Sequence, residues 1–352
     1  MPTGFDFLDT TIRTVGNESE LSVEFLSERS EESSGIPWSE PGYEGTIDYR
    51  IRQLSYSSST LLHTCPRKYE LYKKRAIHVG PPREEDDPTS NTSITFAFGH
   101  VIGEAIQKVY EGWSLEKIIF QMFIHWDADL YAVDEKAKKS LFEAIFAVRK
   151  FIALREQGFL ADYDLVYYQG KPACELSFSI ILPDGFRYRG FVDVVLIHRH
   201  TGVVVVLECK TTKAKAVNPA TYKNSAQAIG YSIVLDAIFP DLSHYEVLYL
   251  VYSSTELEYN VFPFTKNYLQ RALWIRELLL EVERIKMYEE AEIYPMHGEN
   301  CFNFFRECEY INSCTLSTEY LTKPPTPEAE DKTDYQIVVS ITDLIQAQID
   351  KE

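Results

Sequence analysis

The sequence predicts an α/β fold in which a mixed central sheet is flanked by helices. Residues 173–213 alternate between apolar and polar positions, are rich in Val, Ile, Phe and Tyr, and are interrupted by turn sequences, as expected for three or four strands. Residues 95–157 and 267–291 instead carry apolar residues at helical spacing. Of the 352 residues, 45% are hydrophobic and 13% are aromatic, which is enough for a sizeable core.

The remaining elements follow in chain order. A compact region begins near Ile51, and we expect a helix within residues 55–74 with Ser57 as its N-cap. After the strands, helical spacing returns at residues 224–239, and two further strands are expected at 245–254 and 257–264. A long helix, a cysteine-bearing segment, a Pro-rich linker and a short terminal element complete the chain.

The charge of the chain excludes some classes of function. The formal net charge is −18, so the protein does not coat nucleic acid by bulk positive charge, and any nucleic-acid binding needs a local basic groove. Residues 1–47 hold ten Asp or Glu against two Arg, and we expect a mobile or peripherally docked arm there.

Neither a membrane nor a secretory location is indicated. No run of 18 apolar residues is present, and the first residues lack the basic and apolar regions of a signal peptide. Six cysteines are too sparse for a disulfide scaffold, so in an intracellular, cytoplasmic chain a cysteine cluster is expected to bind metal or to do redox chemistry.

Two carboxylates and a lysine are expected to meet between residues 189 and 213. Glu208 and Lys210 are two apart on one strand and point to one face, and the turn at residues 198–202 suits a hairpin that brings Asp193 beside them. Two hard oxygen ligands with open positions suit Mg²⁺ or Mn²⁺, and a nearby lysine can orient or deprotonate water or stabilise a phosphoryl transition state. The alternative is an exposed ion pair on an ordinary hairpin.

The order of the motifs favours the site. Gly190 and Asp193 form a GxxD motif, Glu208 and Lys210 an ExK motif, and Gln227 and Tyr231 a QxxxY motif on the following helix. This stretch resembles the PD-(D/E)XK nuclease superfamily in its RecB-like exonuclease branch. The resemblance implies a restriction-endonuclease-like fold with metal ligands Asp193 and Glu208 and catalytic Lys210, while Gln227 and Tyr231 contact the active site or DNA.

One family motif is incomplete. RecB-like nucleases usually carry GxxxHxxxE on a helix, with the histidine as a further metal ligand, but here Gly99 is followed by Gly103 at the histidine position. Water, Glu104, Gln107 or His100 are the alternatives for that ligand, although an exposed or core role suits His100 better. Glu175 is a weaker candidate for a supporting carboxylate.

Four cysteines form a second candidate site. Thiolates are soft ligands that bind an iron–sulfur cluster or zinc, and the alternative is a set of unrelated buried thiols. One early and three late cysteines resemble the AddB-type and CRISPR-associated iron–sulfur nucleases, which implies a 4Fe-4S cluster joining the N- and C-terminal parts, with Zn²⁺ as the alternative metal. The ligands would be Cys65, Cys301, Cys308 and Cys314. Cys174 and Cys209 are interpreted as small core residues.

The resemblance divides the chain into three parts. They are the arm at residues 1–47, a nuclease-like domain at 48–322 with a helical insertion at about 95–160 and the cysteine cluster at 301–314, and a linker with a short tail at 323–352. The cysteine segment also resembles bacteriophage-encoded members, which would place the protein in the host cytoplasm.

The predicted function is a metal-dependent DNA nuclease, of exonuclease or single-strand type, in recombination, repair or phage DNA metabolism, with a helicase or recombination protein as a possible kind of partner. The alternatives are a catalytically weak binding or assembly module and an RNA-directed nuclease. Two basic stretches are expected to contact phosphates, the first of which has a solvated helix face as its alternative. They comprise Arg67, Lys68, Lys73, Lys74, Arg75, Lys213 and Lys215.

Overall fold

The computed structural model describes residues 51–74, 94–126, 139–242, 245–303, 306–321 and 335–350. The predicted acidic arm at 1–47, Arg75 and the whole predicted linker lie outside the described residues. The helices are α3 (Tyr56–Thr64), α4 (Pro66–Lys73), α5 (Ile94–Tyr110), α6 (Leu115–His125), α7 (Leu141–Glu156), α8 (Ala220–Lys223), α9 (Ala226–Val234), α10 (Tyr268–Glu290), α11 (Thr318–Leu321) and α12 (Ile341–Ile349). The strands are β1 (Gln53–Leu54), β2 (Tyr163–Leu165), β3 (Tyr167–Tyr168), β4 (Lys171–Pro172), β5 (Cys174–Ile181), β6 (Arg187–His198), β7 (Val204–Thr212), β8 (Tyr245–Ser253), β9 (Glu258–Lys266), β10 (Phe302–Asn303), β11 (Arg306–Glu307) and β12 (Ile337–Ser340).

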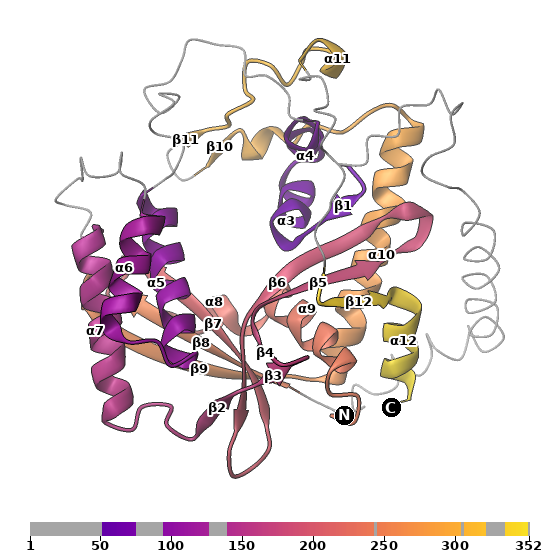
Figure 1. The fold of residues 1–352 in the computed structure, drawn as a ribbon. Coiled ribbons are helices and arrows are strands. Elements are labelled where there is room, and N and C mark those ends of the chain that lie inside the picture. Colours follow the sequence, from indigo (N-terminus) through magenta and orange to yellow (C-terminus); the bar gives the residue numbers. More distant parts are fainter. Residues whose placement is uncertain are drawn as a thin grey trace, which may run out of the picture.

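A mixed sheet runs through the molecule between two groups of helices (Figure 1). Its main path has the order β12-β5-β6-β7-β8-β9, and β1 and β2 also pair with β6. Neighbours along β5-β6-β7 are antiparallel, β7 and β8 are parallel, and β8 and β9 are antiparallel. Parallel neighbours need a crossover connection, and α9 lies in the one between β7 and β8. The predicted α/β fold with a mixed, helix-flanked sheet is therefore confirmed.

Each face of the sheet carries its own hydrophobic core. The α9/α10 core includes Val206, Tyr249 and Trp274 and continues into α3 and α12. The α5–α7 core, on the other face, includes Phe98 and Leu207. Because both faces are covered, β7 begins as an unbroken apolar run from residue 204 to 207, without the alternation of a half-exposed strand.

The first helix starts two residues earlier than the sequence predicts. Ser55, not Ser57, is the N-cap of α3, and its side chain accepts a hydrogen bond from the Ser58 backbone N–H while the Ser58 hydroxyl accepts one from the Ser55 N–H. This capping box satisfies two backbone donors that the helix itself cannot pair. Ser57 is an exposed residue in the first turn. Prediction of the cap at Ser57 was therefore wrong.

The terminal segment belongs to the main domain. Strand β12 pairs in parallel with β5, so it forms an edge of the central sheet. Helix α12 then packs beside α10, where the Gln348 amide donates a hydrogen bond of 2.7 Å to the buried Asp236 carboxylate, which also pairs with Arg271 of α10. The segment predicted as a short tail thus supplies a strand and a helix to the fold.

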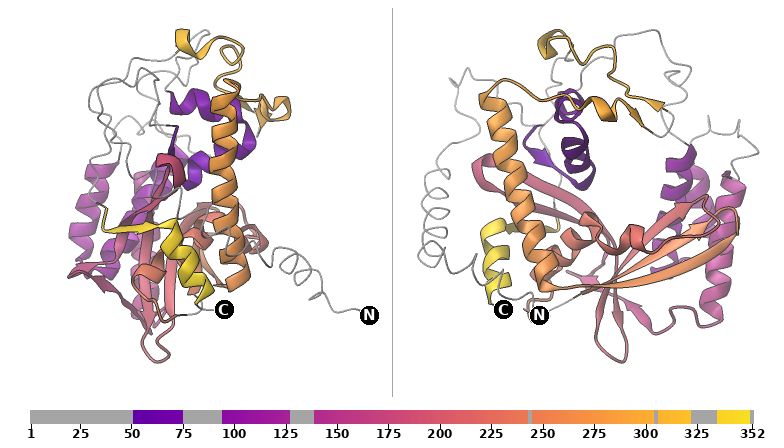
Figure 2. Two further views of the ribbon diagram at one scale, coloured as in Figure 1. Left: turned by 90° about the vertical axis from the view of Figure 1, so that its right-hand side faces the viewer. Right: turned by 180° about the vertical axis from the view of Figure 1, so that it is seen from behind.

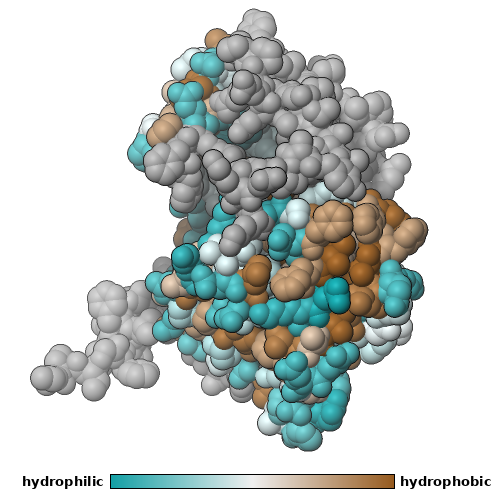
Figure 3. Space-filling view, turned by 90° about the vertical axis from the view of Figure 1, so that its left-hand side faces the viewer, coloured by the Kyte–Doolittle hydropathy of each residue, from teal (hydrophilic) through white to brown (hydrophobic). Residues whose placement is uncertain are grey.

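Helices α5, α6 and α7, predicted as an insertion, form the cover of one whole sheet face. Their outer surface is strongly apolar, and Figure 3 shows hydrophobic residues gathered on this side of the molecule. Among the described residues, Phe120 and Phe142 are 67% and 72% exposed there. In the part of the chain that the structure describes, no helix combines the length and the apolar composition that a membrane crossing requires.

Candidate active site

Three carboxylates lie level with one another on three adjacent strands. The β6–β7 ladder ends at the pair Val194–Leu207, and one further step in the same register sets Asp193 opposite Glu208. On the other side of β6, the pairs Cys174–Val194 and Leu176–Val192 set Glu175 opposite Asp193. The hairpin that the sequence predicts therefore brings Asp193 and Glu208 together.

The strands are distorted at this level. Residues two apart on a regular strand share a face, but Val192 lies in the α9/α10 core and Val194 in the α5–α7 core. On β5, Leu176 and Cys174 divide in the same way, and Glu175 between them has a left-handed φ of 48°. A non-glycine residue in this region is strained, and such strain is concentrated at functional sites.

The Asp193 and Glu208 carboxyl groups are in contact and perturb each other. Burial, followed by the negative charges of Glu208 and Glu175, raises the pKa of Asp193 well above its ordinary value. Burial also raises the pKa of Glu208, against the lowering effect of the Lys210 ammonium. A protonated Asp193 carboxyl can donate to Glu208. The site is therefore electrostatically costly as it stands and favours an additional positive charge.

Lys210 is held by a residue of its own strand, β7, and by a residue of helix α9. Its ammonium forms an ion pair with Glu208 and donates a hydrogen bond of 3.3 Å to Gln227 Oε1. The Gln227 amide in turn donates to the Tyr231 hydroxyl, one helical turn further along α9, at 2.6 Å. Burial alone would lower the pKa of Lys210, but the Glu208 and Asp193 carboxylates outweigh it and the pKa is raised. Lys210 is therefore a firmly held cation.

The donor set fits a small divalent cation. Glu208 is only 1% exposed, and among the described residues its Oε2 is a buried oxygen without a hydrogen-bond donor. That oxygen and the adjoining Asp193 carboxyl are hard ligands, and Mg²⁺ is commonly bound through one or two carboxylates while it keeps several waters. Within the described part of the chain, no group of three or more His, Cys, Asp or Glu side chains has the arrangement of a metal site. The fit thus concerns a two-carboxylate site, with Asp193 and Glu208 as the ligands.

Helix α5 closes the other side of the site without a histidine. A Cβ atom added to Gly99 would lie only 3.2 Å from Thr211 Oγ1, so this glycine lets the helix approach β7 closely. One added to Gly103 would lie 3.9 Å from Cys209 Cβ, which is an ordinary van der Waals contact. Of the suggested substitutes, His100 is exposed and stacks on Phe96.

The other two substitutes have partners elsewhere. Glu104 pairs with His125 of α6 at 2.6 Å. Gln107 is buried and donates a hydrogen bond of 2.7 Å to Glu175. Among the described residues, α5 therefore contributes to the site through the Gln107–Glu175 contact, which the sequence did not predict, because only the fold places residue 107 next to residue 175.

The cysteine-bearing segments from the two ends of the domain lie side by side (Figures 1 and 2). Cys65 precedes α4, and the Arg67 guanidinium donates to the Cys314 carbonyl at 2.8 Å. The Cys308 N–H donates to the Cys301 carbonyl at 2.7 Å. Partial burial, and then the Cys308, Cys314 and Cys65 thiols, raise the pKa of Cys301.

Cys301 is thus within electrostatic range of the other three thiols, but among the described residues the four do not form a group arranged to hold a metal. The four-cysteine site stays a prediction. Cys174 and Cys209 pack against the α5–α7 core, and burial raises the pKa of each thiol. Their packing is that expected of small apolar side chains.

The first basic stretch is engaged within the protein. Arg67 contacts the segment at residues 314–318, Lys68 pairs with Glu309 at 3.1 Å, and Lys74 pairs with Glu70 at 2.9 Å. Lys73 donates to the Gln53 carbonyl. Lys213 and Lys215, in contrast, are exposed in the loop after β7. The phosphate-contact role of all these residues stays a prediction, and the geometry favours the loop over the helix.

Asp193, Glu208 and Lys210 thus meet on adjacent strands of a mixed sheet, and Gln227 from the next helix contacts the lysine. The sequence model of the PD-(D/E)XK nuclease superfamily matches residues 53–315. This chain belongs to that superfamily. The match ends before β12 and α12, so the last strand and helix lie outside the matched region.

The structural comparison gives a more distant likeness. The crystal structure of the "Putative exonuclease" from Eubacterium rectale is 12% identical in sequence, and the alignment covers 83% of this chain and 97% of that chain with a TM-score of 0.43. None of the curated proteins matches this chain in sequence.

Proposed function

We propose that the protein is a Mg²⁺- or Mn²⁺-dependent DNA nuclease that hydrolyses phosphodiester bonds as an exonuclease or a single-strand-directed enzyme. A role in DNA recombination, repair or phage DNA metabolism, beside a helicase or recombination protein, is part of the same proposal. The observation that carries it is the meeting of Asp193, Glu208 and Lys210 at the end of the β6–β7 ladder, with a buried Glu208 oxygen that has no donor among the described residues.

Each side chain has a role that follows from its contacts. Asp193 and Glu208 would hold the cation, which when bound supplies a water of lowered pKa and neutralises charge on a phosphoryl oxygen. Its contacts with Glu208 and Gln227 make the Lys210 ammonium a hydrogen-bond donor and a cation at the site. Its ammonium would donate to a phosphate oxygen where negative charge develops. Gln227 and Tyr231 fix the direction of that ammonium.

The test is cleavage of end-labelled DNA by the purified full-length chain. Single- and double-stranded DNA, labelled at the 5′ or 3′ end, would be incubated with Mg²⁺, Mn²⁺ or EDTA, and RNA of the same sequence would be the comparison for an RNA-directed enzyme. We expect cation-dependent cleavage of DNA, with mononucleotide or short products released from one end by an exonuclease. Absence of cleavage with either cation would overturn the proposal.

The second candidate is a catalytically weak DNA-binding or assembly module. The observation that favours it is Gly103, which leaves the family's histidine position without a side chain. Binding of DNA without cleavage under every cation condition would support this candidate. Cleavage that Asp193→Asn abolishes would exclude it.

We further propose that Cys65, Cys301, Cys308 and Cys314 bind a 4Fe-4S cluster, or Zn²⁺ in its place, that joins the two ends of the domain. Protein purified without oxygen should be brown, and Cys65→Ala should lower the melting temperature as much as Cys314→Ala, because each removes one ligand of the same metal. Cys209→Ser is the matched control. Colourless protein with stoichiometric zinc would replace iron by zinc, and metal-free protein would end this proposal.

A further inference from the structure

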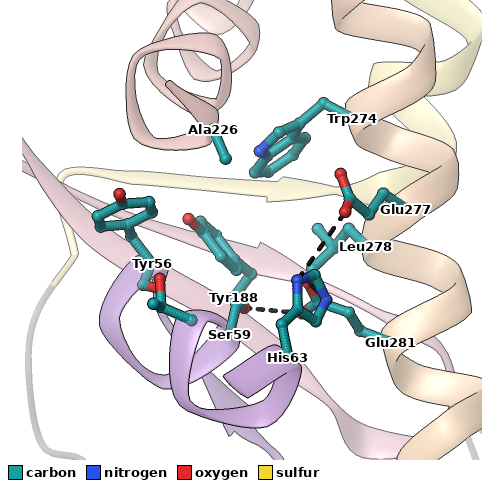
Figure 4. Close-up of a pocket in the computed structure, with 10 residues that line it drawn as sticks. Tyr56, Ser59, His63, Tyr188, Ala226, Trp274, Glu277, Leu278 and Glu281 are labelled. Carbon is teal, nitrogen blue, oxygen red and sulfur yellow. Dashed lines mark hydrogen bonds and ion pairs between the residues drawn. The ribbon is translucent and has the colours of Figure 1, made fainter. Parts of the chain in front are cut away.

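A pocket lies between four elements that are far apart in the sequence. Helix α3 forms one side, α10 the opposite side, and β6 and the start of α9 the remainder. Figure 4 shows Tyr56, Tyr188, Ala226 and Trp274 around its open space, with His63 and the α10 carboxylates at one end. None of these residues belongs to the nuclease motifs of the sequence.

The aromatic walls combine one exposed ring with a fixed pair. Tyr188 and Trp274 are 5% and 6% exposed and meet edge to face, with ring centres 5.2 Å apart. A Cβ atom added to Gly230 of α9 would lie 2.8 Å from the Trp274 ring. A residue with a side chain at this position would therefore clash with the ring. Tyr56 is 40% exposed. A flat aromatic ligand could stack on the Tyr56 ring without any rearrangement of the buried pair.

The polar end of the pocket is acidic. His63 Nε2 is 3.1 Å from Glu281, and His63 Nδ1 is 4.0 Å from Glu277. The Ser59 hydroxyl also donates to Glu281, at 2.7 Å, so Glu281 is occupied, while the Glu277 side chain is 57% exposed. Two carboxylates outweigh one imidazolium, so the pocket repels a phosphate group. The Glu277 carboxylate accepts hydrogen bonds and therefore suits a ligand that carries an amino group.

The pocket adjoins the catalytic lysine. Ala226 lines the pocket, and the next residue, Gln227, accepts the hydrogen bond from Lys210. A ligand with a negative group at Lys210 and an aromatic group in the pocket would therefore bridge the two.

We propose that this pocket is a base-binding subsite, which holds the nucleobase of a nucleotide whose phosphate is bound at Lys210. The proposal rests on the nuclease function proposed above and adds to it a preference for bases with an exocyclic amino group, which Glu277 would accept. Stacking on aromatic side chains is the usual means by which single-stranded nucleic acid is bound without strict sequence readout.

The test measures binding of single-stranded DNA in which one position at a time lacks its base. The probes are fluorescein-labelled strands of about 12 nucleotides, a length within the range that single-strand binding sites cover. The full-length chain carries Asp193→Asn to keep the strands intact, and binding is followed by fluorescence anisotropy. Removal of one particular base should weaken binding about tenfold, because one stacked base contributes about that factor.

Three further variants assign that effect to the pocket. Tyr56→Ala should abolish the dependence on that base, and Tyr56→Phe should retain it because the ring remains. Tyr167→Ala, which removes a 64% exposed ring on β3 outside the pocket, should leave it unchanged. Glu277→Gln should reduce the preference for cytosine or adenine over thymine at the same position.

Two negative results are distinguishable. If the wild-type chain cleaves DNA but every missing base has an equal effect on binding by the Asp193→Asn chain, or the base dependence survives in Tyr56→Ala, the subsite is overturned and the nuclease function stands. Loss of DNA binding and cleavage under every condition would overturn both.

Discussion

Replacement of Asp193 by asparagine should inactivate the nuclease and at the same time stabilise the fold in the absence of divalent cations. The Asp193 and Glu208 carboxyl groups are in contact, and burial together with the Glu208 charge raises the pKa of Asp193. Glu208 Oε2 is also buried without a donor among the described residues. An amide at position 193 would remove the repulsion and could donate to that oxygen.

The magnitude follows from the contact. Two unit charges about 4 Å apart repel by about 4 kcal/mol at an effective dielectric constant near 20. The Lys210 ammonium, paired with Glu208, offsets part of this repulsion, and uptake of a proton by Asp193 limits the rest. We therefore expect Asp193→Asn to increase the free energy of unfolding by about 1–3 kcal/mol, the range for relief of one unsatisfied buried group. At about 2 °C per kcal/mol, the melting temperature should rise by about 2–6 °C.

The assay is thermal unfolding of the full-length chain, followed by circular dichroism in EDTA and again with excess Mn²⁺. Mn²⁺ should stabilise the wild-type protein by about 2.7 kcal/mol at one hundred times its dissociation constant and should stabilise Asp193→Asn much less. The matched control is Asp164→Asn on β2, which removes an exposed carboxylate paired with Arg199 and should not raise the melting temperature. A lower melting temperature of Asp193→Asn in EDTA would refute the electrostatic reasoning, because Asp193 would then be a stabilising partner in the fold.

Three further outcomes are expected. Lys210→Met should lower the cleavage rate by about 100-fold or more. Unlike Asp193→Asn, it should also lower the melting temperature in EDTA, because Glu208 loses its partner. Lys215→Met is the exposed control, and a Lys210→Met rate equal to the wild-type rate would remove Lys210 from the mechanism. The hydrogen bond with Glu281 raises the pKa of His63, so the contribution of the His63–Glu281 pair to stability should be present below about pH 6.5 and be lost as the pH rises further. The difference in melting temperature between wild type and His63→Gln should therefore shrink from pH 5.5 to 8.5. A constant difference would contradict this pH dependence. Gln348→Ala removes a donor to a buried carboxylate and should cost about 1–3 kcal/mol in urea unfolding, whereas a neutral effect would show that α12 is not anchored there.

The sequence predicted the parts of the site that depend on local periodicity. Glu208 and Lys210 share a face because strand residues alternate, and Gln227 meets Tyr231 because they are four apart on a helix. The hairpin between β6 and β7 brings Asp193 beside Glu208 and Lys210, which are close to it in the chain. Such contacts follow from neighbouring residues, so a single sequence is enough to predict them.

Contacts between distant segments could not be predicted in this way. Strand β12 consists of four residues and pairs with β5, about 160 positions earlier, and Val338 within it is 54% exposed, so nothing in its own pattern marks it as part of the central sheet. The pocket between α3 and α10 likewise combines lining residues that are more than 200 positions apart in the sequence. For the N-cap, four serines at 55 and 57–59 offer equivalent chemistry, and the end of β1 at Leu54 decides between them.

The arrangement of charge explains how a chain with a net charge of −18 could still act on DNA. Arg67, Lys68 and Lys74 pair with carboxylates of the protein, so their charge is largely neutralised before DNA approaches. Near the candidate site, Lys210 and the exposed loop with Lys213 and Lys215 can attract phosphate, beside two carboxylates that repel it. A divalent cation at Asp193 and Glu208 reverses that repulsion locally, so the affinity for DNA should depend on the cation and not only the rate of cleavage.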